Sequence, residues 1–394
     1  MTDEIKQLKE QVQAEVERLA PDLLSVSQFL HANPELAYEE HQAAELLTDV
    51  LGQHGFAVER GLANLPTSFK GTIGSGAPRI AFLAEYDALP GLGHACGHNL
   101  IGTASLGAAL AVRSILGRVP GAAVLVGCPA EEKGGGKIAL VEAGAFADID
   151  AALMVHPSNR TELVKFALGM REVTVEFFGK ATHAAMSPDL GINALDAAVL
   201  AYTSVGVLRQ QVRPDARIHG IITHGGQAPN IIPEYAAARF FVRSLDINYV
   251  DTLFGRLVHC CEGAAKATGC EVKFTSAGYT YHPYKPAYAL AEMFRQNWET
   301  LGEAVDQGPP EREIGSTDVG NVSQIVPTIQ PMVQICGPDI SCHMTGFAEA
   351  AASDLGQRVM LTSAKALAMT AVDLLTDPAA LVKVATEFRS PAPR

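Results

Sequence analysis

The chain has 394 residues, of which 48% are hydrophobic and 19% are charged, as is ordinary for a soluble globular enzyme. This length favours two domains over one. The 43 acidic residues outnumber the 30 basic residues and give a net charge of −13, which disfavours binding to nucleic acids or to an anionic membrane surface. An anionic small substrate stays possible, because the net charge does not describe a local pocket.

The N-terminal segment MTDEIKQLKEQVQAEVERL is charged and lacks the apolar core of a secretory signal. No run of about 18 apolar residues occurs, so we expect no membrane-spanning helix. The seven cysteines are sparse and odd in number, which argues against a disulfide framework. We therefore predict a cytoplasmic protein that binds neither nucleic acid nor membrane.

Two amphipathic helices are predicted at the start of the chain. In the first, apolar residues recur at steps of three and four, which is the period of a helix with one buried face. The second follows HANPE and covers residues 43–51. The apolar positions of the first helix are Leu8, Val12, Val16, Leu19 and Leu23.

Short apolar runs then alternate with helical stretches. This alternation predicts an α/β domain with a large, mostly parallel sheet flanked by helices, in which ligands bind beyond the carboxyl ends of the strands. The expected strands are 80–86, 122–130 and 151–156, and the expected helices are 104–116 and 137–146.

From residue 168 the pattern changes to strand–helix–strand–strand–helix–strand, which is the order of a ferredoxin-like α+β sandwich. Beyond about residue 282 the helical pattern of the first part resumes. We therefore predict a discontinuous catalytic domain, residues 1–167 and 282–394, with an inserted domain at 168–281. The expected strands of the insertion are 171–179, 216–226, 234–246 and 271–280, and its helices are 192–211 and 250–268.

The heptapeptide GHACGHN (93–99) leaves three possible roles for Cys96: a nucleophile, half of a disulfide or a metal ligand. The sparse cysteines weaken the second role. Glycines around a Cys-x-His pair let Cys96 and His98 face one centre, and a thiolate with an imidazole suits zinc or another transition ion. A pair this short also occurs by chance, so by itself it does not decide the role.

Further titratable residues follow the predicted strands. Glu131 and Glu132 are adjacent and would be costly near a buried centre without a cation, although an isolated pair also suits a solvated turn. His156 ends another predicted strand, where a structural role is also common, and His343 lies in a later loop. Together with the Cys-x-His pair, these residues supply enough donors for two metal ions that share a ligand.

Longer motifs occur in one order along nearly the whole chain. They resemble the co-catalytic metallopeptidases related to aminoacylase and glutamate carboxypeptidase, and within them the amidohydrolase branch with hippurate hydrolase, indole-acetyl-amino-acid hydrolases and aminobenzoyl-glutamate hydrolase. The resemblance implies a zinc-exopeptidase-like catalytic domain with an inserted lid or dimerisation domain. The motifs are FLHANPELAYEE (29–40), AEYDALPGLGHACGHN (84–99), PAEEKGGGK (129–137), the VHP around His156, FFGKATHAAMSPDLGINALDA (177–197), GGQAPNIIPEYAAARFFVRS (225–244) and GSTDVGNVS (315–323).

The resemblance also implies a dinuclear metal centre. Each subunit would bind two divalent ions, Zn²⁺ or Mn²⁺, because both suit this kind of donor set. The implied ligands are Cys96, His98, Glu132, His156 and His343.

Other residues receive roles by the same resemblance. Glu131 would be the general base, and Asp87 would orient the first metal site. His183 of the inserted domain would stabilise the oxyanion, commonly in the active site of the partner subunit, and Asn230 would hold the substrate. Arg243 has two open interpretations, pairing with a substrate carboxylate or serving as an ion-pair strut in its strand.

One departure from the family pattern leaves a question open. Other branches have His-x-Asp where this chain has Glu85-Tyr86-Asp87, and an aspartate bridge where Cys96 stands. Whether Glu85 contacts a metal is therefore undecided. His94 and Asp318 are expected to support the ligands from behind.

The predicted activity is hydrolysis of an amide bond by a metal-activated water molecule. The substrate would be an N-acyl amino acid, an aminobenzoyl-glutamate-like amide or a small dipeptide, and the enzyme would be a homodimer through the inserted domain. One alternative is an amidase with Cys96 as nucleophile and His98 or His94 as base. Another is a non-catalytic binding homologue, which would predict broken ligand motifs.

Overall fold

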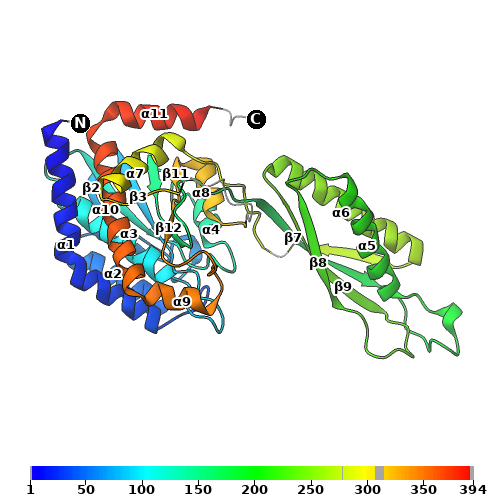
Figure 1. The fold of residues 1–394 in the computed structure, drawn as a ribbon. Coiled ribbons are helices and arrows are strands. Elements are labelled where there is room, and N and C mark those ends of the chain that lie inside the picture. The colour runs from blue at the N-terminus through cyan, green and yellow to red at the C-terminus, as the bar shows by residue number, and fades with distance from the viewer. Residues whose placement is uncertain (1, 277, 307–314, 391–394) are drawn as a thin grey trace. The chain divides into compact units, whose positions relative to one another are not determined.

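The structure is a computed structural model that describes residues 2–276, 278–306 and 315–390. The chain divides into two compact units, one formed by Met1–Phe166 with Lys285–Arg394 and the other by Ala167–Tyr284. In Figure 1 the second unit is coloured from green at residue 167 to yellow-green at residue 284, and the other residues belong to the first unit.

A six-stranded mixed sheet forms the centre of the first unit, in the order β1-β2-β4-β3-β5-β11. Strands β4, β3, β5 and β11 run parallel to one another, whereas β1 and β2 add two antiparallel pairings at one edge. The predicted, mostly parallel sheet is thus confirmed. The strands are β1 (Ala57–Arg60), β2 (Phe69–Ser75), β3 (Arg79–Ala84), β4 (Gly121–Gly127), β5 (Ala151–Leu153) and β11 (Thr328–Ile329).

Helices flank this sheet. All five predicted apolar positions of the first helix are buried, and the Thr2 side chain caps it by accepting the backbone N–H of Ile5. The helices are α1 (Asp3–Ala32), α2 (His41–Gln53), α3 (His98–Arg113), α4 (Gly136–Glu142), α7 (Tyr288–Thr300), α8 (Val319–Ile325), α9 (Thr345–Ala352), α10 (Asp354–Thr376) and α11 (Pro378–Arg389), with a short 3-10 turn at Leu62–Asn64.

Helix α10 is long and apolar enough, by length and composition, to cross a membrane. However, 78% of its apolar stretch is buried inside the protein, where it packs against α1 and α3. Its hydrophobicity is therefore that of a core helix.

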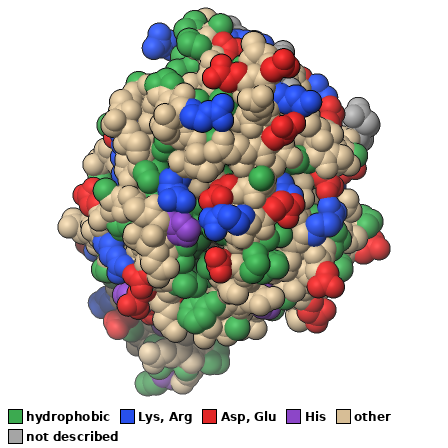
Figure 2. Space-filling model, turned by 90° about the vertical axis from the view of Figure 1, so that its left-hand side faces the viewer, with side chains coloured by type: hydrophobic (Ala, Val, Ile, Leu, Met, Phe, Trp, Pro, Cys, Tyr) green, Lys and Arg blue, Asp and Glu red, His purple; other side chains and the backbone are tan. Residues whose placement is uncertain are grey.

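On the face shown in Figure 2, acidic and basic side chains are interspersed.

The prediction of one continuous strand over residues 151–156 is wrong. Strand β5 ends at Leu153, and His156 begins a separate strand, β6 (His156–Ser158), which pairs in parallel with β12 (Met332–Gln334). Pairing with β3 ends at Leu153, whereas pairing with residues 327–334 continues, because the N–H of Met154 donates to Ile329 O at 3.1 Å and that of His156 to Pro331 O at 2.8 Å. His156 therefore lies at the start of a strand in a small second sheet.

The second unit has the predicted order of elements around one antiparallel sheet, β10-β7-β9-β8. Helices α5 and α6 pack on this sheet and form an apolar core of their own. Strand β10 ends earlier than the predicted residue 280, and residue 277 lies outside the described residues. The elements are β7 (Gly169–Phe178), α5 (Ala194–Leu208), β8 (Arg217–His224), β9 (Tyr235–Ser244), α6 (Ile247–Thr268) and β10 (Glu271–Thr275), with 3-10 turns at Pro188–Leu190 and Arg209–Gln211.

Candidate metal centre

The Cys96–His98 segment joins β3 to α3 in a tight turn. Gly97 has φ +78°, and a Cβ at this position would lie 2.8 Å from Pro157 Cγ, so only glycine fits without strain. His98 is the first residue of α3 and is fully buried, and Cys96 is 8% exposed. The turn therefore places a thiol and an imidazole on either side of one glycine.

The Glu131–Glu132 pair lies in the turn after β4. Ala130, which precedes it, has a positive φ of +58°, and its N–H donates to the buried carboxylate of Glu40 at 2.8 Å. The N–H of Glu132 donates to Asp87 Oδ2 at 3.0 Å. Two carboxylates from other segments thus fix the backbone on both sides of Glu131.

The fifth predicted ligand, His343, is held against the Cys96 turn by its backbone. Its N–H donates to Ala95 O at 2.8 Å, and its own φ is +69°, an uncommon conformation for a non-glycine residue. Its Nε2 lies 3.4 Å from Glu132 Oε2. The loop in the last third of the chain therefore reaches the strand ends of the first third.

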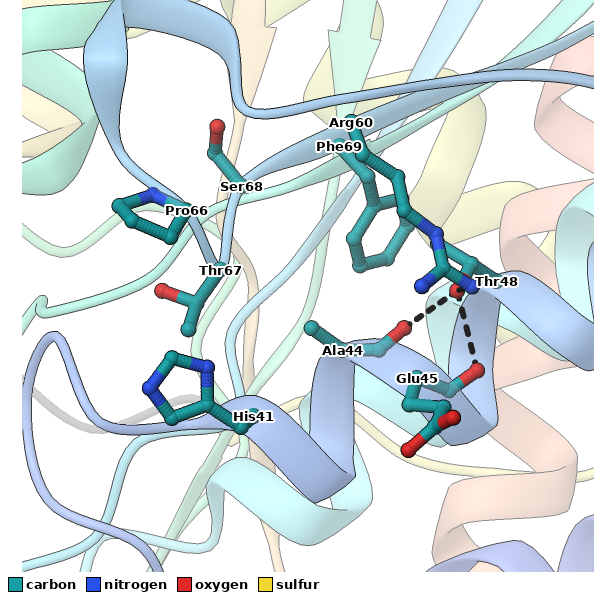
Figure 3. Close-up of a pocket in the computed structure, with 9 residues that line it drawn as sticks. All are labelled: His41, Ala44, Glu45, Thr48, Arg60, Pro66, Thr67, Ser68 and Phe69. Carbon is teal, nitrogen blue, oxygen red and sulfur yellow. Dashed lines mark hydrogen bonds between the residues drawn. The ribbon is translucent and has the colours of Figure 1, made fainter.

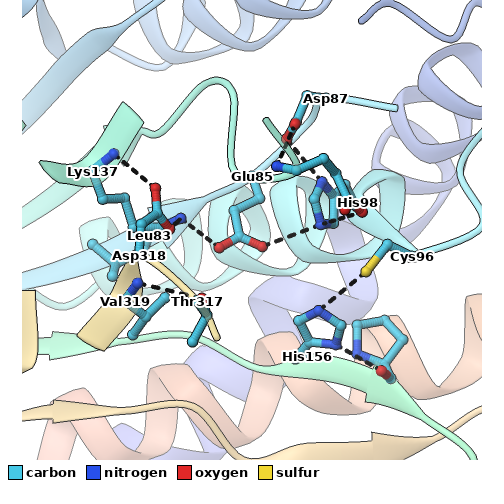
Figure 4. A network of polar contacts seen from close by, with 12 residues as sticks. Leu83, Glu85, Asp87, Cys96, His98, Lys137, His156, Thr317, Asp318 and Val319 are labelled. Carbon is cyan, nitrogen blue, oxygen red and sulfur yellow. Dashed lines mark hydrogen bonds and ion pairs between the residues drawn. The ribbon is translucent and has the colours of Figure 1, made fainter. Parts of the chain in front are cut away.

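The structure brings all five predicted ligands into one cluster. Figure 4 shows three of them, Cys96, His98 and His156. Cys96 Sγ lies 3.5 Å from His156 Nε2. The donor atoms of Cys96, His98 and His156 lie within 4.8 Å of one another, as do those of Cys96, Glu132 and His343. Because the two groups share Cys96, the arrangement has room for two cations with one bridging ligand.

The chemistry of the cluster fits divalent cations. Buried polar atoms face one another without a hydrogen-bond partner among the described residues, notably His98 Nε2 and Glu132 Oε1, which are 3.8 Å apart. Such orphaned atoms are costly unless a cation satisfies them. Thiolate, imidazole and carboxylate donors together suit Zn²⁺ or Mn²⁺.

The protonation states of two of the five ligands, His156 and Glu132, suit metal binding. Burial lowers the pKa of His156 to about 4, which favours the neutral imidazole that metals bind. Burial would raise the pKa of Glu132, but the hydrogen bond from His343 and the charge of His98 bring it down to about 2. Glu132 is therefore an ionised carboxylate, whose oxygens can bind a cation.

Asp87 orients the cluster from behind. Its Oδ1 accepts a hydrogen bond from His98 Nδ1 at 2.9 Å, which turns Nε2 toward the other donors. Its Oδ2 accepts the N–H of Glu132. One fully enclosed carboxylate thus positions a histidine and the backbone of a glutamate.

Two buried charged residues were missed by the sequence analysis. Lys137 is fully buried between Glu85 and Asp318 (Figure 4). The Glu40 carboxylate accepts the N–H of Ala130. In the sequence both lie in charged stretches, KGGGK and YEEH, that also suit a solvated surface. The one available signal is that Lys137 directly precedes the apolar run of α4.

The remaining predicted residues lie in the second unit. His183 is exposed, and its Nδ1 accepts the N–H groups of Ala185 and Met186, each at 3.2 Å, so that Nε2 carries the hydrogen in the neutral ring. Asn230 is next to it, because Asn230 O accepts the N–H of Ala184. Arg243 is partly buried in β9, with its guanidinium 5.6 Å from the Phe241 ring.

A cavity of about 260 Å³ lies between α2 and the segment around β2 (Figure 3). It includes none of the predicted site residues. Thr67 connects it indirectly to the site, because its hydroxyl donates to Glu40 at 2.8 Å. The lining residues are His41, Ala44, Glu45, Thr48, Arg60, Pro66, Thr67, Ser68 and Phe69.

An α/β unit with thiolate, imidazole and carboxylate donors clustered beyond its strands, joined to an inserted α+β unit, defines a class of metal-dependent amide hydrolases. The model of peptidase family M20/M25/M40 matches residues 81–366, and the chain belongs to this family. It is a hydrolase of amide bonds, as predicted. The matches do not support the cysteine-nucleophile or non-catalytic alternatives.

Individual relatives cover nearly the whole chain. An Xaa-Arg dipeptidase of Mus musculus is 42% identical over 98% of this chain and 93% of its own length. One of the subunits of the p-aminobenzoyl-glutamate hydrolase of Escherichia coli K12 is 30% identical over 91% of this chain and 90% of its own. A solved dinuclear metal-binding peptidase of the M20 family from Bacillus subtilis has a TM-score of 0.69 at 18% identity, covers 91% of this chain and 99% of its own, and shows the shared fold.

Proposed function

We propose that this protein is a dinuclear metal-dependent dipeptidase that cleaves small dipeptides with a basic C-terminal residue. The observation that carries the proposal is the cluster of two donor groups sharing Cys96. The substrate class follows the 42% identical Xaa-Arg dipeptidase. The net charge of −13 also favours a cationic substrate, because an acidic protein attracts it by long-range electrostatics.

The two cations would be held by Cys96, His98 and His156 on one side and by Cys96, Glu132 and His343 on the other. Two ions bound there would polarise the substrate carbonyl and acidify a water molecule. Cys96 would then be a bridging thiolate, since coordination deprotonates a thiol. The dinuclear peptidase of Bacillus subtilis with the same fold supports this number of ions.

Glu131 is the proposed general base. Its carboxylate lies within 4.8 Å of the donor atoms of His98 and Glu132, next to the cluster, and its backbone is fixed on both sides. From there it can take a proton from the attacking water and pass it to the leaving amine. Asp87 keeps His98 in the orientation that this requires.

Three residues of the second unit complete the proposal. His183 would donate its Nε2 hydrogen to the oxyanion, which is consistent with the acceptor role of its Nδ1. Asn230 would bind the substrate beside it. Arg243 would pair with the substrate carboxylate, with an internal strut role as its alternative.

A second candidate substrate is p-aminobenzoyl-glutamate, which is favoured by the 30% identity to the Escherichia coli hydrolase over 91% of this chain. This amide carries two carboxylates, and the strongly acidic chain would repel it more than a basic dipeptide. We therefore place it second.

The proposal includes a cytoplasmic homodimer. All seven cysteines are free thiols, and a metal-binding Cys96 requires a reducing compartment. The second unit offers an edge strand, β8, with exposed Ile221 and Ile222, and exposed apolar residues on α5. These features suit contact with a second copy of the same unit.

The proposal is tested with purified protein supplied with Zn²⁺ or Mn²⁺. The panel holds dipeptides ending in Arg, Lys or Glu, N-acyl amino acids and p-aminobenzoyl-glutamate, and the released amino acid is measured. We expect the highest kcat/KM for the dipeptides ending in Arg or Lys. Preference for p-aminobenzoyl-glutamate would favour the second candidate.

Two controls separate metal-dependent hydrolysis from other chemistry. Glu131→Ala should lose about 100-fold or more in kcat while keeping its metal content, because general base catalysis contributes roughly that factor. EDTA should abolish turnover, and added metal should restore it. Turnover that resists EDTA, or a chain to which no stoichiometric metal can be restored, would contradict the proposal.

A further inference from the structure

A buried ammonium lies directly behind the metal cluster. Lys137 Nζ is 2.6 Å from Glu85 Oε1 and 2.6 Å from Asp318 Oδ1, and all three side chains are fully buried (Figure 4). Glu85 follows β3, Lys137 lies in the first turn of α4, and Asp318 directly precedes α8. Three elements that are distant in the sequence thus meet at one ion-pair cluster.

The position of Lys137 is fixed by its backbone as well as its side chain. Its N–H donates to Asp318 Oδ2 at 2.9 Å, while its ammonium contacts Asp318 Oδ1. Burial alone would lower the pKa of Lys137, but the carboxylates of Asp318 and Glu85 raise it above its ordinary value. The side chain is therefore a charged group held by two carboxylates.

The Glu85 carboxylate lies between the Lys137 ammonium and His98, one of the proposed metal ligands. Its Oε1 contacts Lys137, and its Oε2 lies 3.5 Å from His98 Nε2, the donor atom of a proposed metal ligand. A buried, ionised carboxylate next to a divalent ion would bind that ion if nothing else neutralised it. Among the described residues, Glu85 belongs to a possible cation group with Glu131 and Asp318 and not to the group of Cys96, His98 and His156. The Lys137 ammonium pairs with Glu85 and Asp318 and thus supplies a positive charge to this acidic group.

We propose that Lys137 is a positioning residue that holds the Glu85 carboxylate away from the metal bound at His98. This inference rests on the proposed dinuclear centre. This chain has a buried carboxylate at position 85 together with a buried ammonium that neutralises it. The metal therefore keeps a coordination position that Glu85 would otherwise fill, and that position stays available to water and substrate.

The test uses the full chain loaded with Co²⁺, whose visible absorption reports the number of ligands around the metal. In Lys137→Met the Glu85 carboxylate is released and binds the metal, so the intensity of the Co²⁺ absorption should fall as the number of ligands rises. In the double variant Lys137→Met/Glu85→Gln, the neutral amide at position 85 should not bind the metal. The wild-type Co²⁺ spectrum should therefore return. A merely structural role of Lys137 would not give this rescue.

Two further proteins sharpen the test. Glu85→Gln alone should keep the wild-type Co²⁺ spectrum, and a changed spectrum would mean that Glu85 is already a ligand and would overturn the proposal. If Lys137→Met does not fold, Lys137→Met/Asp318→Asn removes one charge of each sign and should show the same loss of intensity.

The failures of the two proposals are distinguishable. Normal Co²⁺ loading with an unchanged spectrum in the foldable Lys137 variant would overturn the role of Lys137 alone. A wild-type chain that binds no Co²⁺ would refute the metal centre, and with it the positioning role.

Discussion

Glu40 shows how much one buried carboxylate can organise. It is fully buried and accepts hydrogen bonds from three segments: the N–H of Tyr38, the hydroxyl of Thr67 and the N–H of Ala130. Ala130 has a positive φ and directly precedes the proposed general base. Glu40 therefore stabilises the turn on which the chemistry depends without belonging to the cluster itself.

Replacing Glu40 by alanine should destabilise the protein and impair catalysis. The substitution leaves the Thr67 hydroxyl and the Ala130 N–H without their acceptor, which costs on the order of 2–4 kcal/mol in the free energy of unfolding. Denaturant unfolding measures this loss, and kcat measures the displacement of Glu131. Glu39→Ala, at the adjacent exposed position, is the matched control and should change stability by less than about 0.5 kcal/mol.

The loss of stability in Glu40→Ala should depend on pH. Burial raises the pKa of Glu40 above its ordinary value, despite its hydrogen-bond donors. The Glu40 carboxyl therefore binds a proton more tightly in the folded state than in the unfolded state. Its contribution to the free energy of unfolding is complete below the ordinary pKa of a glutamate and is lost as the pH rises through the raised pKa. The difference in stability between Glu39→Ala and Glu40→Ala should shrink from acidic to neutral pH, and a difference that grows would contradict this.

The candidate ligands could be predicted because the long motifs around them resemble a known family. The Cys-x-His pair between glycines and the two adjacent glutamates indicated possible metal donors, but by themselves they left their roles open. Lys137 and Glu40 could not be predicted in this way. Their burial depends on partners that lie far away in the sequence, such as Asp318 for Lys137 and Ala130 for Glu40.

At the scale of elements, the start of α3 decides the geometry of the cluster. Gly97 caps this helix in the left-handed region, with Pro157 against it. Cys96 and His98 flank it, so any shift of this glycine moves two proposed ligands at once.

Gly97→Ala should lower both stability and metal affinity. An alanine in the left-handed region costs about 1–2 kcal/mol, and its Cβ would also contact Pro157 Cγ at 2.8 Å. Thermal unfolding with and without metal, and metal titration by competition with a chelator, measure the two effects. Gly52→Ala in α2 is the control, since nothing lies within 4 Å of its Cβ position, and it should stabilise the helix by about 0.5–1 kcal/mol. Unchanged metal affinity in Gly97→Ala would contradict the role of this turn.

The order of elements was predictable because hydrophobic period and turn residues are local signals. The βαββαβ order of the second unit and the parallel strands of the first follow from them. Strand pairing depends on distant segments, and this explains the error at His156. The run AALMVH has the composition of one strand, but its pairing with β3 ends at Leu153, and His156 starts the separate strand β6.

At the scale of the whole molecule, self-association is the main open property. Strand β8 is an edge strand, and Ile221 on it is 62% exposed, so an apolar side chain lies on a strand edge that can pair with a second copy. We expect Ile221→Lys to convert the proposed dimer to monomers, because a charge on this edge opposes pairing with a second copy.

Sedimentation velocity measures the shift directly. Val382→Lys on α11, a 64% exposed position in the first unit, is the matched control and should leave the oligomeric state unchanged. If His183 acts in the partner's active site, mixing Glu131→Ala chains with His183→Ala chains should recover activity in the dimeric background and not with Ile221→Lys. A wild-type chain that sediments as a monomer would refute the dimer.

The contribution of the last third of the chain to the first unit has a consequence for biosynthesis. Asp318, His343 and the core helix α10 leave the ribosome only after the contiguous second unit has emerged. The second unit can therefore fold early, as domains generally do during translation. Residues 1–166 can complete their packing only after residues 285–394 have been synthesised. The newly made polypeptide consequently cannot complete the donor group of Cys96, Glu132 and His343 until its synthesis is nearly complete.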